Sequence, residues 1–143
     1  MDNYIGTRYH KFVAPRKRKE IRELKYLVAI PIPFLDRNGA QLNSQEVEDW
    51  TRKATRELSQ CFGGATSVPS PGLYNNLAGK VLYEEKGQIL VMSACGDRDE
   101  YLAKRDHIQT FADRMAEALN QESIFVLAFP SDSFLIEYSA EGE

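Results

Sequence analysis

Apolar runs of strand length are the strongest signal along the chain. Residues 26–33 are apolar without interruption, and residues 89–92 repeat this character. Continuous apolar runs of this length are typical of central strands that helices cover. Two of the flanking strands, 80–85 and 88–95, are separated by Lys86-Gly87, which predicts a hairpin turn. Further strands are expected at 65–68, 124–129 and 134–138, with proline-containing breaks at 69–72 and 130–133.

Two segments have the three- and four-residue spacing of amphipathic helices. The first begins at Asn43 or Ser44, where Asn43 and Glu46 have capping-box spacing, and ends at Gly63-Gly64. The second begins at Asp97 and ends at Asn120. The predicted buried stripe of the first helix comprises Val47, Trp50, Ala54 and Leu58, and that of the second comprises Ile108, Phe111, Ala112, Met115 and Leu119.

The order of these elements predicts an α+β fold. It is the ferredoxin-like β-α-β-β-α-β arrangement, a two-layer sandwich with an extra C-terminal strand. We expect a basic N-terminal arm at 1–24, a single domain at 25–138 and a frayed tail at 139–143. Right-handed crossovers predict that strands 26–33 and 88–95 are parallel neighbours in the middle of the sheet.

Parallel central strands would bring two polar loops to one edge, where both helices begin. Helix N-termini with basic side chains favour a phosphate or carboxylate, and carboxylates favour a hard cation such as Mg²⁺ or Mn²⁺. The alternative is that the same residues only cap helices and turns. The predicted anion ligands are Arg37, Asn38 and Arg98, and the predicted metal ligands are Asp36, Asp97 and Asp99.

Charge is divided unevenly along the chain, whose net charge is -3. Residues 1–25 carry eight basic and three acidic side chains, whereas the remainder carries ten basic and eighteen acidic ones. A basic arm on an acidic body suggests a polyanion or an acidic partner. Arg16, Lys17, Arg18 and Lys19 are therefore candidate nucleic-acid contacts, and a solvated loop is the alternative.

Other chemistry-bearing residues are sparse. Cys61 and Cys95 lack the spacing of a metal motif, so we expect two buried free thiols. His10 lies in the arm and His107 lies beside the apolar stripe of the second helix. The sequence holds neither a nucleophile elbow nor a phosphate-loop motif. No apolar run approaches the roughly 20 residues of a membrane span, and the N-terminus does not resemble a signal peptide.

One turn supports a resemblance. The run 58–66 ends in Phe-Gly-Gly-Ala-Thr and is followed by Pro69 and by Gly72-Leu-Tyr74. It is similar to a turn in small uncharacterised bacterial and mobile-element proteins. The resemblance implies a bacterial or phage origin and a structural or ligand-binding importance for Gly63, Gly64 and Thr66.

These observations predict a non-catalytic, cytoplasmic binding module that forms a homo-oligomer. Its ligand would be a small anionic or nucleotide-like molecule or a protein partner, with no cofactor. The first alternative is a metal-dependent phosphodiesterase or nuclease that uses Asp36 with Asp97 or Asp99, and Mg²⁺ or Mn²⁺. The second is a nucleic-acid binder that acts through the basic arm.

Overall fold

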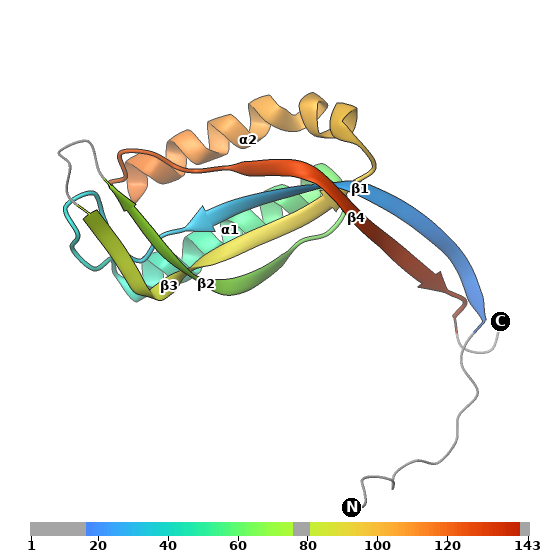
Figure 1. Cartoon of the computed structure of the whole chain (residues 1–143), viewed down its shortest axis with the longest axis horizontal. Helices are drawn as coiled ribbons and strands as arrows, with labels where there is room; N and C mark the ends of the chain where they lie inside the picture. The colour runs from blue at the N-terminus through green and yellow to red at the C-terminus, as the bar shows by residue number, and fades with distance from the viewer. Residues whose placement is uncertain (1–16, 76–80, 141–143) are drawn as a thin grey trace, which may run out of the picture. The chain divides into compact units, whose positions relative to one another are not determined.

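The computed structural model describes the backbone of residues 17–75 and 81–140, and the side chains of 17–70 and 87–140. Four strands and two helices alternate in the expected order (Figure 1). The strands are β1 (Arg18–Ile32), β2 (Thr66–Asn75), β3 (Val81–Cys95) and β4 (Leu127–Tyr138). The helices are α1 (Ser44–Phe62) and α2 (Arg98–Ala118).

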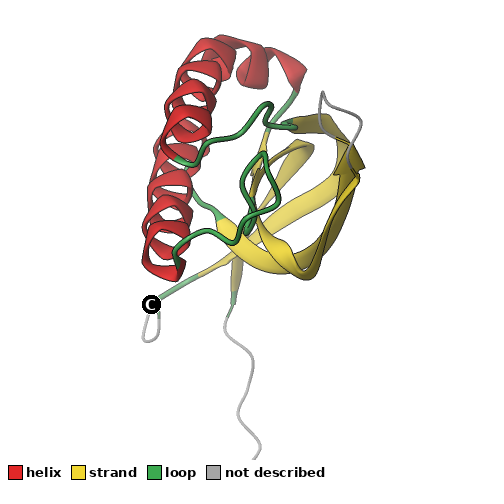
Figure 2. Ribbon diagram, turned by 90° about the vertical axis from the view of Figure 1, so that its left-hand side faces the viewer, coloured by secondary structure: helices red, strands yellow, loops and turns green. Residues whose placement is uncertain are grey.

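The predicted α+β sandwich is confirmed. The strands form one sheet in the order β2-β3-β1-β4, and α1 and α2 form a second layer on one face of it (Figure 2). Both helices contribute to a core that also contains β1 and β3 residues. Its fully buried members include Val28, Ile30, Ile32, Leu58, Val91, Ile108 and Met115.

The central strand pair is antiparallel, so the prediction of a parallel pair was wrong. Tyr26 lies opposite Cys95, and Ile32 lies opposite Ile89. The reason is topological: α1 returns the chain so that β2 runs in the direction of β1, and the following hairpin reverses β3. The C-terminal ends of β1 and β3 therefore lie at opposite edges, about 20 Å apart at the strand rise of roughly 3.3 Å per residue.

The β2–β3 ladder contains an irregularity where a hairpin turn was predicted. Ser70 pairs with Gln88 and Gly72 pairs with Glu84, so three residues of β3 lie opposite one residue of β2. Gly87 has a φ of 91°, which a glycine adopts without strain. The predicted turn at Lys86-Gly87 is thus a bulge within β3. The two prolines of β2 are accommodated because β2 is an edge strand.

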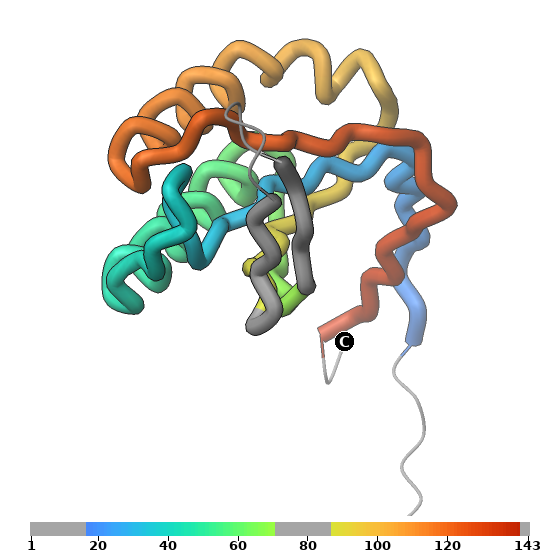
Figure 3. The backbone as a smooth tube through the Cα atoms, turned by 60° about the vertical axis from the view of Figure 1, so that its left-hand side comes forward, coloured from blue at the N-terminus to red at the C-terminus, as the bar shows by residue number. Residues whose placement is uncertain are grey.

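The predicted extra C-terminal strand is not separate from the strand before it. β4 runs without a break through Pro130 from Leu127 to Tyr138, beside β1 (Figure 3). An edge strand tolerates Pro130, because a proline there removes no hydrogen bond that a second neighbour needs. Ser131 also stabilises the extended path, since its hydroxyl donates to the Leu24 carbonyl at 3.4 Å.

The chain divides into two compact units. One comprises residues 1–22 and 134–143, and the other comprises residues 23–133. In the smaller unit, the Ser139 N–H donates to the Lys17 carbonyl at 3.0 Å, and Arg22 lies 3.7 Å from Glu137. Both helices, and every pocket described below, belong to the larger unit.

Local sequence signals explain where the helices begin. The Asn43 side chain accepts hydrogen bonds from the Gln45 and Glu46 N–H groups, and the Asp97 side chain accepts one from Glu100. These caps satisfy donors that a helix leaves unpaired at its start. Gly63 ends α1 in the left-handed conformation, with a φ of 97°. The predicted helix boundaries are therefore confirmed to within a residue or two.

Candidate functional site

A pocket of about 480 Å³ opens between the start of α1 and the sheet. Its size falls within the range of roughly 300–1,000 Å³ that is typical of small-molecule sites. The apolar part of its lining comes from Phe34, Leu42, Val47 and Ile89. The polar part comes from Gln41, Ser44, Glu48, Thr51 and Ser67.

One face of α1 supplies four of these side chains. Ser44, Val47, Glu48 and Thr51 are separated by three or four residues, so they lie on the same side of the helix. Val47 is buried and anchors this face to the core. Sequence analysis assigned Val47 to the core and did not assign a role to its polar neighbours. The missed signal was polar residues that share the helical spacing of the apolar stripe.

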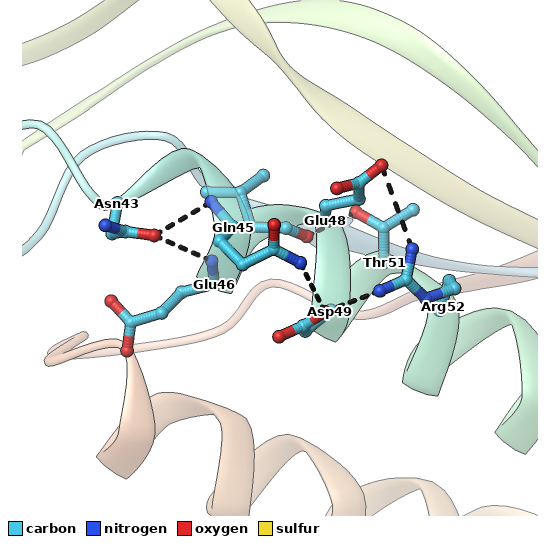
Figure 4. A network of polar contacts seen from close by, with 8 residues as sticks. Asn43, Gln45, Glu46, Glu48, Asp49, Thr51 and Arg52 are labelled. Carbon is cyan, nitrogen blue, oxygen red and sulfur yellow. Dashed lines mark hydrogen bonds and ion pairs between the residues drawn. The ribbon is translucent and has the colours of Figure 1, made fainter.

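Glu48 is the one charged residue that lines this pocket. Figure 4 shows its carboxylate beside Arg52, whose Nη1 lies 3.8 Å from Glu48 Oε2. Arg52 makes its closer contact elsewhere, because its Nη2 lies 2.6 Å from Asp49 Oδ1. Gln45 Nε2 also donates to Asp49, at 3.0 Å. Arg52 is therefore held mainly by Asp49, and the exposed Glu48–Arg52 pair leaves most of the charge of Glu48 available to a ligand.

Hydroxyl groups provide further hydrogen-bonding capacity in the pocket. Thr51 Oγ1 donates to the Val47 carbonyl at 2.8 Å, which leaves its oxygen lone pairs able to accept. Ser67 lies near the start of β2 and is exposed. The pocket can therefore hold a mostly apolar molecule that carries hydroxyl or amino donors and a positive charge.

The predicted meeting of Asp36 with Asp97 does not occur, because the two residues follow strands whose ends lie at opposite edges of the sheet. The neighbour of the Asp36 loop is the C-terminal end of α2. The Arg37 N–H donates to the Asn120 carbonyl at 2.9 Å. Gln121 is buried, and its Nε2 donates to the Leu35 carbonyl at 2.8 Å.

Asp36 organises its own loop. Its Oδ1 accepts hydrogen bonds from the N–H groups of Asn38 and Ala40, at 2.8 and 2.9 Å. Burial alone would raise the pKa of the Asp36 carboxyl, but hydrogen bonds from Ala40, Asn38 and Asn120 outweigh it and hold the pKa below its usual value. Asp36 is therefore the turn residue that the alternative interpretation described.

Asp36 should make the stability of the fold depend on acidity. Because its pKa is lowered in the folded state, its contribution is complete above the ordinary value of 3.8 and is lost as the pH falls through the lowered pKa. Asp36→Asn is expected to cost about 1 kcal/mol of unfolding free energy at pH 7 and to flatten the stability profile below pH 3.8. Urea unfolding at a series of pH values measures both effects. An unchanged acid profile in the variant would contradict this role.

Asp97, Arg98 and Asp99 lie at the start of α2, where Asp97 is the N-cap. Glu100 completes the cap, because its Oε1 accepts the Gly96 N–H at 2.7 Å. All three predicted site residues are exposed. Across the described ranges, no group of three or more His, Cys, Asp or Glu side chains is arranged to hold a metal ion. A role for these residues in binding Mg²⁺ or Mn²⁺ stays a prediction without the shared edge on which it was based.

The Phe62–Thr66 turn joins α1 to the sheet. The Gly63 N–H caps α1 by donating to the Ser59 carbonyl at 2.7 Å. The Gly64 carbonyl accepts a hydrogen bond from the hydroxyl of Ser93, which is buried in β3. Thr66 begins β2 opposite Met92. This geometry gives the turn a structural task, and its ligand-binding role stays a prediction.

The remaining sequence candidates lie away from the pocket. Lys17, Arg18 and Lys19 are exposed in the smaller unit, whereas Arg16 and His10 fall outside the described residues. Cys61 and Cys95 are free, as predicted, and Cys95 is fully buried. Burial, with the charges of Glu100 and Asp97, raises the pKa of the Cys95 thiol to about 11. His107 is exposed on α2.

Within the described part of the chain, neither helix is long and apolar enough to cross a membrane. This agrees with the absence of a long apolar run in the sequence.

The comparisons with known proteins give a fold and not a family. No family model matches the chain, and no curated protein matches it. Among solved structures, it is similar to a phage SAM lyase in complex with S-methyl-5′-thioadenosine, with a TM-score of 0.57 and 15% sequence identity. That match covers 87% of this chain and 98% of the lyase. A phage SAM lyase in the apo state matches with a TM-score of 0.47 and 15% identity, over 84% and 92% of the two chains.

The prediction of a non-catalytic binding module is contradicted by this likeness, because the protein that shares the fold is an enzyme with a bound nucleoside. The sequence offered no catalytic motif, and the prediction treated that silence as evidence against catalysis. The nuclease alternative also fails, since its carboxylates lie at opposite edges of the sheet. The nucleotide-like character expected of the ligand agrees with the nucleoside bound to the neighbour.

Proposed function

We propose that this protein is a lyase that cleaves S-adenosylmethionine (SAM) and releases S-methyl-5′-thioadenosine, and that the substrate binds in the pocket beside Glu48. Two observations support the proposal. The fold is similar, over most of both chains, to that of a phage SAM lyase. The pocket at the start of α1 combines an apolar lining with a single carboxylate, in a volume of about 480 Å³.

Charge decides which pocket suits this substrate. SAM carries a positive sulfonium, a positive ammonium and a negative carboxylate, so its net charge is positive. Glu48 is the one charged residue of the proposed pocket. A second pocket is lined by Lys53, Arg56 and Arg114 against Glu57 alone, and it would repel the sulfonium. A third, between α2 and residues 122–126, is lined by charges of both signs and by no comparable apolar surface from the sheet.

The chemistry asks little of the protein beyond positioning. When SAM becomes a thioether, the bond between the sulfonium sulfur and the aminobutyryl carbon breaks, and its electron pair goes to sulfur. That carbon then bonds to the substrate's own carboxylate oxygen, or its neighbour loses a proton to give an alkene. The sulfonium is itself the leaving group, so the proposed reaction uses no cofactor. Glu48 would bind the cation and orient it, which pre-pays entropy for the step.

The decisive experiment is to incubate the purified protein with SAM and identify the products by liquid chromatography with mass spectrometry and NMR. We expect S-methyl-5′-thioadenosine together with an aminobutyryl fragment that has gained no water. A heat-denatured sample provides the background, since SAM decomposes slowly in solution. Turnover that does not exceed this background, with protein that binds neither SAM nor S-methyl-5′-thioadenosine by calorimetry, would overturn the proposal.

We further propose that the enzyme is a homo-oligomer of phage origin that acts in the cytoplasm, where its substrate is made and used. Exposed apolar side chains in the smaller unit support self-association, because patches of this kind are typical of protein interfaces. They are Ile21, Phe134, Leu135 and Tyr138, with exposed fractions between 40% and 56%. The native mass of the protein used in the assay reports the oligomeric state.

A further inference from the structure

The groove between the outer surfaces of α1 and α2 differs from the proposed substrate pocket in charge. It has a volume of about 400 Å³. Three cations line it, and Glu57 is the one carboxylate among its lining residues. Because the acidic side chains outnumber the basic ones after residue 25, a local concentration of positive charge in a concave site has no explanation in the fold itself. The cations are Lys53, Arg56 and Arg114.

The three cations are available to a ligand. All three are exposed, and none forms an ion pair with a carboxylate among the described residues. Glu57 is directed elsewhere, because its Oε2 lies 4.0 Å from the Cys61 thiol, one turn along α1. Neutralising these charges is therefore left to solvent or to a bound anion.

Aromatic rings form the apolar part of the same groove. Trp50 and Phe111 pack edge to face, with ring centroids 5.6 Å apart, and Phe111 is buried. The Lys53 Nζ lies 4.4 Å from the centroid of the Trp50 ring. This cation–π contact places a positive charge directly above an aromatic surface. The groove thus offers an apolar wall and cationic groups from two helices within one small volume.

We propose that this groove is a second binding site and that its ligand is a small organic phosphate of mononucleotide size. Arg56 and Arg114 would bind phosphate oxygens through their planar guanidinium groups, and Lys53 would add a third charge. Trp50 and Phe111 would contact the base or sugar. Size and charge favour a compact ligand over a nucleic acid, because a polymer would extend from the groove across an acidic surface that repels its phosphates.

Trp50 makes the proposal directly measurable, since it is the one tryptophan in the sequence. We expect ATP and inorganic pyrophosphate, added without metal, to change its fluorescence saturably. Binding should weaken as salt is raised. Arg56→Ala and Arg114→Ala should each weaken binding by about tenfold or more. Arg98→Ala is the matched control, because Arg98 is exposed on α2 and does not line the groove; its affinity should equal that of the wild type.

The proposal stands apart from the SAM reaction, so the groove variants should cleave SAM at the wild-type rate if that activity is present. No saturable fluorescence change at millimolar ATP or pyrophosphate would overturn it. An equal loss of affinity in Arg98→Ala would also overturn it, because that result indicates general electrostatic attraction. Tighter binding of a single-stranded oligonucleotide than of ATP through the same arginines would overturn the choice of a compact ligand.

Discussion

Glu48→Gln is expected to lower kcat/KM for SAM by about 10- to 100-fold, while the affinity for S-methyl-5′-thioadenosine changes by less than about twofold. A charge-assisted contact is worth about 1.5–3 kcal/mol, and each 1.4 kcal/mol corresponds to a factor of about ten. The substitution keeps the shape of the side chain and removes its charge. SAM is a cation and the thioether product is neutral, so the carboxylate matters only to the first.

The design separates this electrostatic effect from damage to the fold. Glu46→Gln is the control, because Glu46 is exposed in the first turn of the same helix and does not line the pocket. Arg52 stays fixed in the variant through Asp49, at 2.6 Å. Steady-state kinetics measure SAM turnover, and calorimetry measures product binding. Equal losses for SAM and for the neutral product would show that Glu48 acts through structure and not through charge.

Leu58→Ala is expected to destabilise the protein by about 2–5 kcal/mol, because the deletion leaves a cavity in a packed core. Leu58 has no exposed surface and belongs to the cluster that joins α1 to α2 and the sheet. Small domains are stable by only about 5–15 kcal/mol, so the variant should lose much of its folded population on mild heating. Urea unfolding followed by circular dichroism gives the difference.

Leu102→Ala provides the comparison for this loss. Leu102 lies on α2 with 38% of its surface exposed, so the same chemical deletion should change stability by about 0.5 kcal/mol or less. A cost below about 1 kcal/mol for Leu58→Ala would mean that the interface between α1 and the sheet is not the core described here.

Several parts of the fold were predictable because their causes are local. An asparagine or aspartate at a helix start and a glycine at a helix end satisfy backbone groups within a few residues of themselves. Asn43, Asp97 and Gly63 therefore marked the helix ends correctly. The apolar stripe that includes Leu58 marked the buried face of α1 in the same way.

The errors arose where the outcome depends on pairing between distant segments. Pro130 was interpreted as a break between strands, but an edge strand accommodates it. Lys86-Gly87 was interpreted as a turn, but the register of β2 against β3 makes it a bulge. Each segment has the same local preference in both arrangements, so the neighbouring strand decides between them.

The candidate site shows the same division between local and tertiary causes. The sequence by itself determined the α+β order of elements, the limits of the helices and the composition of the core, since hydrophobic periodicity and capping act within one element. Only the tertiary structure decided that the central strands are antiparallel, which separates Asp36 from Asp97. Only the packing of α1 against the sheet placed Glu48 among Phe34, Leu42 and Ile89, because a pocket is made by elements that are distant in the chain.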